Sequence, residues 1–191
     1  MRGGVKLDRG ANSYRRYLDG DDEGLSEIVH EYSDGLILYL NGIVNNIDLA
    51  EELMEETLFK IVTGRPRFVS RHSFKTWLYT IGRNVAIDYL RRQAKHNRIE
   101  ATLIHEVSQD ELDFERIYLL EERRIKLYRA LRNLPADYRQ VLWLVYLDGM
   151  SHTEAGAVMH KNQRQMKNLM YRAKIALKSQ LDQEGFVYEE L

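Results

Sequence analysis

The sequence has no cysteine, only two prolines and no long apolar run. Without cysteine there can be no structural disulfide and no thiolate metal site, which favours a reducing, cytoplasmic location. No window approaches the roughly 20 apolar residues of a membrane span, so no membrane insertion is expected. A Walker loop, a dinucleotide-binding turn and metal-ligand histidine spacing are all missing too. The sequence therefore predicts a protein that is not an enzyme, with no catalytic residue, metal or cofactor.

Charge is divided into four alternating blocks, although the formal net charge is only −1. Residues 1–64 carry 13 acids and 6 bases, whereas residues 65–98 carry nine Lys or Arg and a single acid. Residues 99–122 return to 8 acids against 1 base, and residues 123–191 hold 12 bases against 7 acids. This pattern predicts two basic surfaces for a polyanion and acidic surfaces for another partner. The alternative is a set of solvated helix faces.

Apolar periodicity predicts an all-α fold with two small helical domains joined by a flexible acidic linker, the second domain containing a helix-turn-helix. After an N-terminal extension (1–20), the first domain (21–98) has helices expected near 22–45, 48–62 and 72–95. Asp48, followed by Glu51, is the expected N-terminal cap of the second helix. Phe74, Leu78 and Val85 belong to the expected core face of the third helix.

The second domain is expected at 114–184, after the linker (99–113) and before a short tail (185–191). Helices are predicted at about 114–133 and 135–147, the latter ending at Asp148-Gly149. Ser151 and Glu154 form the pattern of a capping box that opens a short helix, and Asn162 is expected to cap a longer one, 163–181. A short capped helix, a tight turn and a polar, cationic second helix favour DNA binding over a plain helical hairpin.

Three segments together resemble the extracytoplasmic-function (ECF) sigma factors of bacterial RNA polymerase. They read DLAEELMEETLF (48–59), FKTWLYTIGRNVAIDYLRR (74–92) and LPADYR (134–139), the last followed by the helix-turn-helix. The resemblance covers about 20–98 and 115–182. It implies a specificity subunit that directs core polymerase to promoters and helps to melt the −10 element. The implied partners are the β′ clamp helices and β flap of the polymerase core, promoter DNA and an anti-sigma factor.

The resemblance also implies roles for individual residues. The polymerase-binding set is Asp48, Glu51, Glu52, Glu55 and Glu56. The −10 DNA-binding set is Trp77, Arg83, Asn84, Asp88, Arg91, Arg92 and Lys95, although Trp77 can equally be core. The −35 DNA-binding set is Ser151, Thr153, Asn162, Gln163, Arg164, Gln165, Lys167, Asn168 and Arg172.

The sequence departs from the family pattern in the turn of the helix-turn-helix. His160-Lys161-Asn162 replaces the usual small apolar residue and serine, and Met166 stands where a β-branched residue is commoner. The alternative function is a self-sufficient regulator that binds operator DNA as a dimer. Such a regulator would have no need for the Trp, Asn and Arg stripe of the first domain, so this stripe favours the sigma factor.

Overall fold

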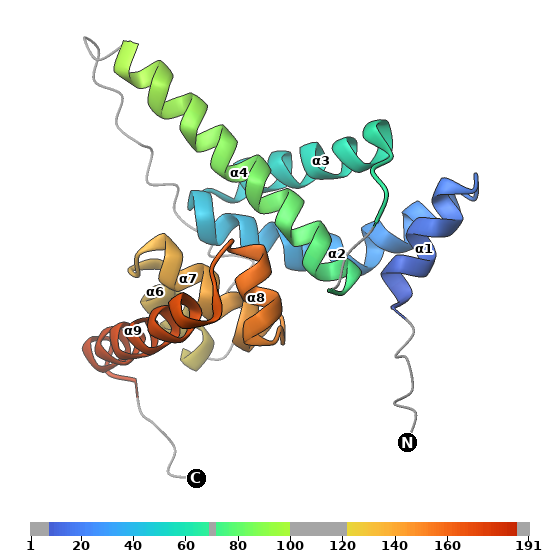
Figure 1. Cartoon of the computed structure of the whole chain (residues 1–191). Coiled ribbons are helices and arrows are strands. Elements are labelled where there is room, and N and C mark those ends of the chain that lie inside the picture. Colours follow the sequence, from blue (N-terminus) through green and yellow to red (C-terminus); the bar gives the residue numbers. More distant parts are fainter. Residues whose placement is uncertain (1–7, 69–71, 100–121, 187–191) are drawn as a thin grey trace, which may run out of the picture.

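The computed structural model describes residues 8–68, 72–99 and 122–186. These residues form helices without a strand, which confirms the all-α prediction. Figure 1 shows α2, α3 and α4 as one bundle, with the later helices below it and α4 extending beyond its neighbours. The predicted linker, 99–113, lies outside the described residues except for Ile99, the last residue of α4. The start expected for the next helix, 114–121, lies outside them as well.

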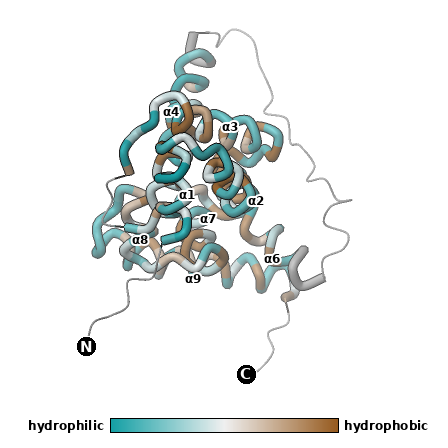
Figure 2. Tube along the Cα trace, turned by 90° about the vertical axis from the view of Figure 1, so that its right-hand side faces the viewer, coloured by the Kyte–Doolittle hydropathy of each residue, from teal (hydrophilic) through white to brown (hydrophobic). Residues whose placement is uncertain are grey.

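The first domain follows the apolar periodicity closely. Its three predicted helices are α2 (Glu23–Val44), α3 (Ile47–Gly64) and α4 (Phe74–Ile99). Their apolar faces turn toward one another, as the brown segments of Figure 2 show, and Phe74, Leu78 and Val85 are at most 1% exposed. Burial of such side chains contributes about 1.5–3 kcal/mol each.

The predicted cap of α3 was wrong. Asn46, not Asp48, is the N-cap, and its side chain accepts a hydrogen bond of 2.7 Å from the backbone nitrogen of Leu49. Asn45 before it takes a left-handed conformation with φ of 55°, which reverses the chain within two residues. Asparagine tolerates that conformation, so the Asn45-Asn46 pair supplies both the turn and the cap.

The N-terminal extension contains a helix, α1 (Arg9–Leu18), that packs against α2 and α4. Asp8 caps α1 through the nitrogen of Ala11 and also accepts a hydrogen bond of 2.6 Å from the nitrogen of Phe74, at the start of α4. Tyr14 is 1% exposed, and its hydroxyl donates to the carbonyl of Pro66 over 2.8 Å. Burial raises the pKa of Tyr14 to about 12, so this hydroxyl keeps its proton at neutral pH.

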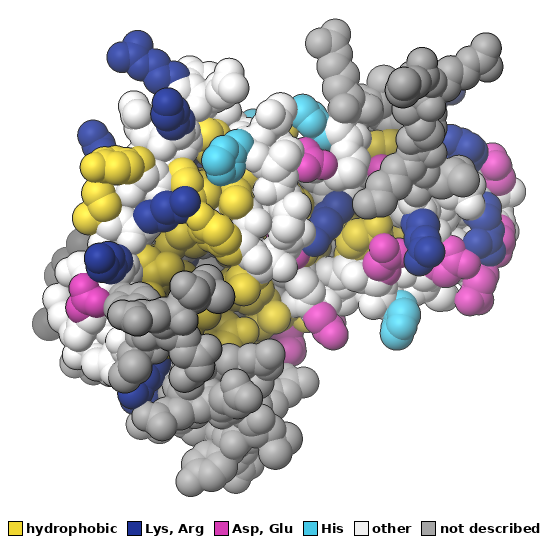
Figure 3. Space-filling view, turned by 90° about the horizontal axis from the view of Figure 1, so that it is seen from below, with side chains coloured by type: hydrophobic (Ala, Val, Ile, Leu, Met, Phe, Trp, Pro, Cys, Tyr) yellow, Lys and Arg dark blue, Asp and Glu magenta, His cyan; other side chains and the backbone are white. Residues whose placement is uncertain are grey.

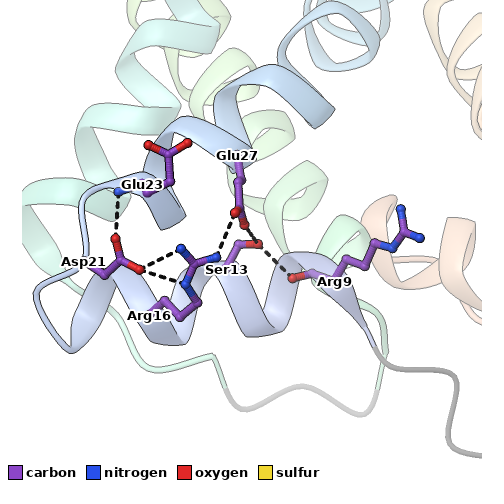
Figure 4. Close-up of polar contacts among 6 residues, drawn as sticks. All are labelled: Arg9, Ser13, Arg16, Asp21, Glu23 and Glu27. Atoms are coloured by element: carbon purple, nitrogen blue, oxygen red, sulfur yellow. Dashed lines mark hydrogen bonds and ion pairs between the residues drawn. The ribbon is translucent and has the colours of Figure 1, made fainter.

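A polar network fixes the turn between α1 and α2 (Figure 4). Arg16 lies 2.7 Å from both Asp21 and Glu27, and Ser13 donates a 2.6 Å hydrogen bond to Glu27. These contacts lower the pKa of Glu27 through its hydrogen bonds from Ser13 and Arg16, and lower the pKa of Asp21 through its bond from Arg16. Their stabilising effect is present at neutral pH and is lost as the pH falls through these lowered values.

Gly24 permits the close approach of α1 and α2. A Cβ atom there would collide with the backbone oxygen of Ser13 and lie 2.9 Å from the backbone nitrogen of Tyr17. We expect Gly24→Ala to lower the free energy of unfolding by about 1–3 kcal/mol, the usual range for overpacking. The matched control is Gly42→Ala, because a Cβ at Gly42 of the same helix meets nothing within 4 Å. Thermal unfolding followed by circular dichroism measures both, and equal melting temperatures would contradict the close approach.

The second domain contains α6 (Glu122–Arg132), α7 (Ala136–Leu142), α8 (His152–Val158) and α9 (Gln163–Gln183). The helix predicted at 135–147 changes to a π-helical turn, η1 (Trp143–Leu147), in its second half. Gly149 then reverses the chain with φ of 67°, as the Asp-Gly pair predicts. The predicted helix-turn-helix is confirmed: Ser151 and Glu154 form a capping box on α8, and Asn162 and Gln165 form another on α9.

The two domains pack together, an arrangement that the sequence did not predict. Helices α2 and α4 contact α7, η1 and α8, and one continuous core runs from Tyr14 to Ala173. Tyr39 and Tyr79 stack within this junction with ring centroids 5.3 Å apart. Burial raises the pKa of both tyrosines, so their hydroxyls stay protonated and donate to groups of the second domain.

Candidate nucleic-acid interface

The acidic face of α3 is open to solvent. Asp48, Glu51, Glu52 and Glu55 are exposed, and they recur at helical spacing on a stable helix. Glu56 differs, because it is half-buried and its carboxylate lies 3.2 Å from Lys60 and 3.9 Å from Arg92. The four exposed carboxylates are therefore available to a basic protein surface, whereas Glu56 already has cationic neighbours.

Phe59 belongs to the same face, and sequence reasoning missed it. Its side chain is 65% exposed, and it lies seven residues after Glu52 and four after Glu55. The signal was available in the sequence, because Phe59 falls outside the apolar stripe through Leu53 and Ile61. An exposed aromatic residue among carboxylates gives this face an apolar anchor of the kind enriched at protein interfaces.

Trp77 lies in an aromatic cluster and is not free for stacking on a base. Its ring centroid is 5.2 Å from that of Tyr14, 5.5 Å from Phe68 and 5.3 Å from Phe74. Because α1 and the segment before α4 cover it, Trp77 is only partly exposed. This packing favours the core interpretation that the sequence left open.

Arg83 and Asn84 contact the second domain. The Arg83 Nε donates a 3.0 Å hydrogen bond to the Oε1 of Gln140, and the Oδ1 of Asn84 lies 3.0 Å from the Nε2 of His160. His160 is in the turn of the helix-turn-helix, with φ of 52°. The structure thus brings a residue assigned to the −10 element against the turn of the −35 motif.

The C-terminal part of α4 presents the remaining residues assigned to the −10 element. Asp88, Arg91, Arg92 and Lys95 are all exposed there. The Nη1 of Arg91 is 3.2 Å from the Oδ1 of Asp88, so one acid partly neutralises the cationic row. An open groove of about 540 Å³ separates this part of α4 from α3. The cations suit a phosphate backbone, and the groove joins them to the acidic face of α3.

The residues assigned to the −35 element divide into caps and free side chains. Ser151, Asn162 and Gln165 cap α8 and α9 through their side chains. Burial tends to raise the pKa of Glu154, but its hydrogen bonds from Ser151 and Ser73 outweigh burial and hold that pKa below its usual value. This capping acid therefore stays ionised, and it fixes the position of the short helix.

The free side chains lie along one face of α9, together with Thr153 on α8. They carry the donors and acceptors that meet base edges and phosphates in a major groove. This exposed set comprises Gln163, Arg164, Lys167, Asn168 and Arg172. Met166, at the position where the family commonly has a β-branched residue, is 1% exposed and packs beneath this face. It holds α9 on α8 and leaves the polar face unchanged.

Apolar side chains gather on the second domain, bordered by Lys and Arg (Figure 3). Tyr146 and Leu147 of η1 are 57% and 48% exposed, and Tyr171 and Ile175 of α9 are 68% and 54% exposed. Lys174 lies over the ring of Tyr146 at 5.4 Å. Exposed apolar patches of this kind are typical of interaction surfaces. No helix within the described residues is long and apolar enough to cross a membrane.

Each of the two domains matches the model of a known protein family. The model for sigma-70 region 2 matches residues 28–96, and the model for sigma-70 region 4 matches residues 124–177. Helix α1 lies before the first match. Together the two matches cover most of the described helices, in the order in which the chain presents them.

The alignments between this chain and its curated relatives span nearly the whole length of those relatives. SigM of Bacillus subtilis, an ECF RNA polymerase sigma factor, is 28% identical over 81% of this chain and 93% of its own. The ECF sigma factor SigW of the same organism is 25% identical over 85% of this chain and 91% of its own. The ECF sigma-E factor of Escherichia coli is 27% identical over 85% of this chain and 88% of its own. These relatives therefore span both domains of the chain.

Solved structures share the fold. The sigma factor RpoE of Bartonella quintana, in complex with the anti-sigma factor NepR, aligns with a TM-score of 0.63 at 23% identity, over 84% of this chain and 98% of its own. CnrH, in complex with the cytosolic domain of CnrY, aligns with a TM-score of 0.66 at 18% identity, over 92% of this chain and 99% of its own. The alternative of a self-sufficient operator-binding regulator is not favoured, because it accounts for only the second domain. The chain belongs to the ECF sigma factors, the subunits that direct bacterial RNA polymerase to promoters and start transcription there.

Proposed function

We propose that this sigma factor binds core polymerase through the acidic face of α3 and reads promoter DNA with two separate helices. Helix α4 holds the −10 element, and α9 reads the −35 element. The observation that supports this division is the charge arrangement of the three helices. Helix α3 exposes four carboxylates, whereas α4 exposes Arg91, Arg92 and Lys95 and α9 exposes Arg164, Lys167 and Arg172. The basic surfaces fit a phosphate backbone, and the acidic surface fits a basic protein.

The residue roles follow from exposure. Asn84, Arg91, Arg92 and Lys95 are the side chains on α4 that can hold an unpaired strand and its phosphates. Trp77 supports them by fixing the start of α4 from within the aromatic cluster. On α9, Gln163, Arg164, Lys167, Asn168 and Arg172 contact DNA, whereas Ser151, Asn162 and Gln165 position those helices as caps. We infer that the protein acts as a non-catalytic subunit, because it belongs with sigma factors, which are transcription initiation factors.

The partners follow from the two protein-binding surfaces. The β′ clamp helices occupy the face formed by Glu52, Glu55 and Phe59, and the β flap occupies the apolar patch around Tyr146 and Tyr171. An anti-sigma factor is the further partner of this chain, as NepR is of RpoE in the complex named above. Sigma factors act on cytoplasmic polymerase, so we place this chain in the cytoplasm.

Promoter DNA should bind the free protein poorly and bind the protein specifically only when core polymerase is present. The net charge of −1 provides little long-range attraction to DNA. Core polymerase fixes the spacing of the two domains, after which the second DNA contact becomes intramolecular. Fluorescence anisotropy with a labelled promoter at about 0.15 M salt, with and without core, measures this difference, and we expect a gain of about 100-fold, at the lower end of the usual avidity range. Tight, sequence-specific binding by the free protein would favour the regulator instead.

A further inference from the structure

Helix α1 precedes the match to sigma-70 region 2, which begins at residue 28, yet it contacts the connection between α3 and α4. The hydroxyl of Tyr14, a residue that is only 1% exposed, donates to the carbonyl oxygen of Pro66 over 2.8 Å. The hydroxyl of Tyr17 lies 3.4 Å from the carbonyl oxygen of Val62, in the last turn of α3. Figure 1 shows α1 beside the path from α3 to α4. Helix α1 therefore reaches both the end of α3 and the residues that follow it.

The start of α4 is joined to α1 by one carboxylate. The Oδ1 of Asp8 accepts a hydrogen bond of 3.1 Å from the nitrogen of Ala11 in α1, and its Oδ2 accepts one of 2.6 Å from the nitrogen of Phe74 in α4. Gly10 lets the two helices come close, because a Cβ atom there would collide with the ring of Phe74. The first N–H groups of a helix have no partner within that helix. A single side chain that satisfies two helices therefore fixes where both begin.

Aromatic rings fill the space between α1, the connection and α4. The ring centroid of Trp77 lies 5.2 Å from that of Tyr14 and 5.5 Å from that of Phe68. Phe68 also lies 5.7 Å from Phe74, so the connection folds back onto the first turn of α4. Aromatic pairs at these separations attract one another beyond the effect of burial. Tyr14 is thus part of the packing that holds residues 65–68 against α4.

The connection held in this way carries two exposed cations, Arg65 and Arg67. Arg65 takes a left-handed conformation with φ of 40° and ψ of 47°, which is unfavourable for a residue with a side chain. Its guanidinium lies over the ring of Tyr17, 5.6 Å from the centroid. Such a conformation persists only where the surrounding structure determines it. Helix α1 therefore fixes two cations immediately before the helix that we assign to the −10 element.

We propose that Tyr14 is a positioning residue for the −10 element, which acts without touching DNA because its side chain is buried. Through Pro66 and Trp77 it holds the two cations and the first turn of α4 in the arrangement that receives the melted strand. A connection that moved freely would have to be ordered when the strand binds, and this ordering would lower the affinity. The role in promoter binding rests on the proposed function, whereas the fixed connection is a separate physical claim.

Amide hydrogen exchange in the free protein tests the fixed connection without reference to function. The probe is the backbone amide of Trp77, which donates to the carbonyl oxygen of Ser73 at 3.1 Å in the first turn of α4. Tyr14→Phe keeps the ring and removes only the hydroxyl. Loss of one buried hydrogen bond shifts a local opening equilibrium by about two- to tenfold. We expect the Trp77 amide to exchange faster by the same factor, because its exchange rate follows the open population.

Tyr17→Phe is the matched control on the same helix. The Tyr17 hydroxyl is farther from Val62 than an ordinary O–H···O bond allows, so its loss should change the exchange of Trp77 by less than about twofold. Asp8→Asn should act like Tyr14→Phe, because a side-chain amide has a single oxygen and cannot accept from two nitrogens. Exchange of Trp77 that neither Tyr14→Phe nor Asp8→Asn alters would overturn the fixed connection.

Holoenzyme binding tests the positioning role. The first probe is a single-stranded oligonucleotide with the −10 sequence of a promoter that the parent holoenzyme melts, and the second is duplex DNA that carries only the −35 element. Tyr14→Phe should weaken binding of the −10 strand by about two- to tenfold, as the connection must then be ordered on binding. Binding of the −35 duplex should stay unchanged, because α9 keeps its own contacts. Tyr17→Phe should leave both affinities unchanged.

The two measurements decide separate claims. Faster exchange of Trp77 with unaltered binding of the −10 strand would overturn the positioning role. Equal weakening at both elements would overturn it as well, since a general loss of folded protein acts on both domains. If the parent holoenzyme melts no promoter, the proposed function fails, whereas the exchange of Trp77 still decides whether α1 fixes the connection.

Discussion

Reversing two charges on α3 should weaken binding to core polymerase by at least about 100-fold. Glu52→Lys with Glu55→Lys places two cations where exposed carboxylates would meet a basic surface, and like charges at an interface cost several kcal/mol. About 2.7 kcal/mol is enough for that change in affinity. Both residues are exposed, and no ion pair within the described residues involves either side chain, so helix α3 should keep its fold. Competition with the unaltered protein for core polymerase measures the effect.

A matched control separates the acidic face from net charge. Asp19→Lys with Asp34→Lys changes the charge by the same amount at exposed positions outside α3, the C-cap of α1 and a site on α2. It should leave core binding within about twofold, because surface charges away from the contact act weakly at physiological salt. Phe59→Ala should also weaken binding, since it removes the exposed apolar anchor of the face. Equal affinity of the charge-reversed and unaltered proteins would remove α3 from the docking site.

Removing the strand-holding side chains of α4 should stop promoter melting while leaving initial promoter binding largely intact. The change is Asn84→Ala with Arg91→Ala and Arg92→Ala, all exposed positions. Loss of the contacts that these side chains make to an unpaired strand and its phosphates should reduce open complex by more than tenfold, for which about 1.4 kcal/mol is enough. Permanganate footprinting of the mutant holoenzyme reports unpaired thymines directly.

The opposite pattern is expected for α9. Arg164→Ala or Lys167→Ala should weaken the closed complex, and a lost bidentate base contact costs about 1–3 kcal/mol. Once promoter is saturated with holoenzyme, strand opening should proceed at the unaltered rate. Wild-type melting by the triple variant of α4 would contradict its assignment to the −10 element, whatever the result for α9.

The sequence by itself determined the helices and their inward faces. Phe74, Leu78 and Val85 were predicted as one core face and are buried, because a period of 3.6 residues places them on one side of any helix. The capping box at Ser151 and the cap at Asn162 were equally readable, since a cap depends on residues three apart. The cap of α3 was misassigned to Asp48 because the turn is made by left-handed Asn45, a conformation that the local pattern did not reveal.

Only the tertiary structure decided how the domains meet and which polar residues remain free. The apolar periodicity of a helix shows that its apolar face must be buried, but it does not show which other helix buries it. The packing of α7 and α8 on α2 and α4 therefore could not be predicted from the sequence pattern. Asp148 resembled an ordinary helix-terminating residue, yet folding places it 2.7 Å from Lys75, 73 positions earlier in the chain. Arg83 and Trp77 had the residue types of a DNA contact, and packing directs one to Gln140 and the other into an aromatic cluster. Local sequence fixes helix type and face, whereas long-range packing determines which charged and aromatic side chains are left for a partner.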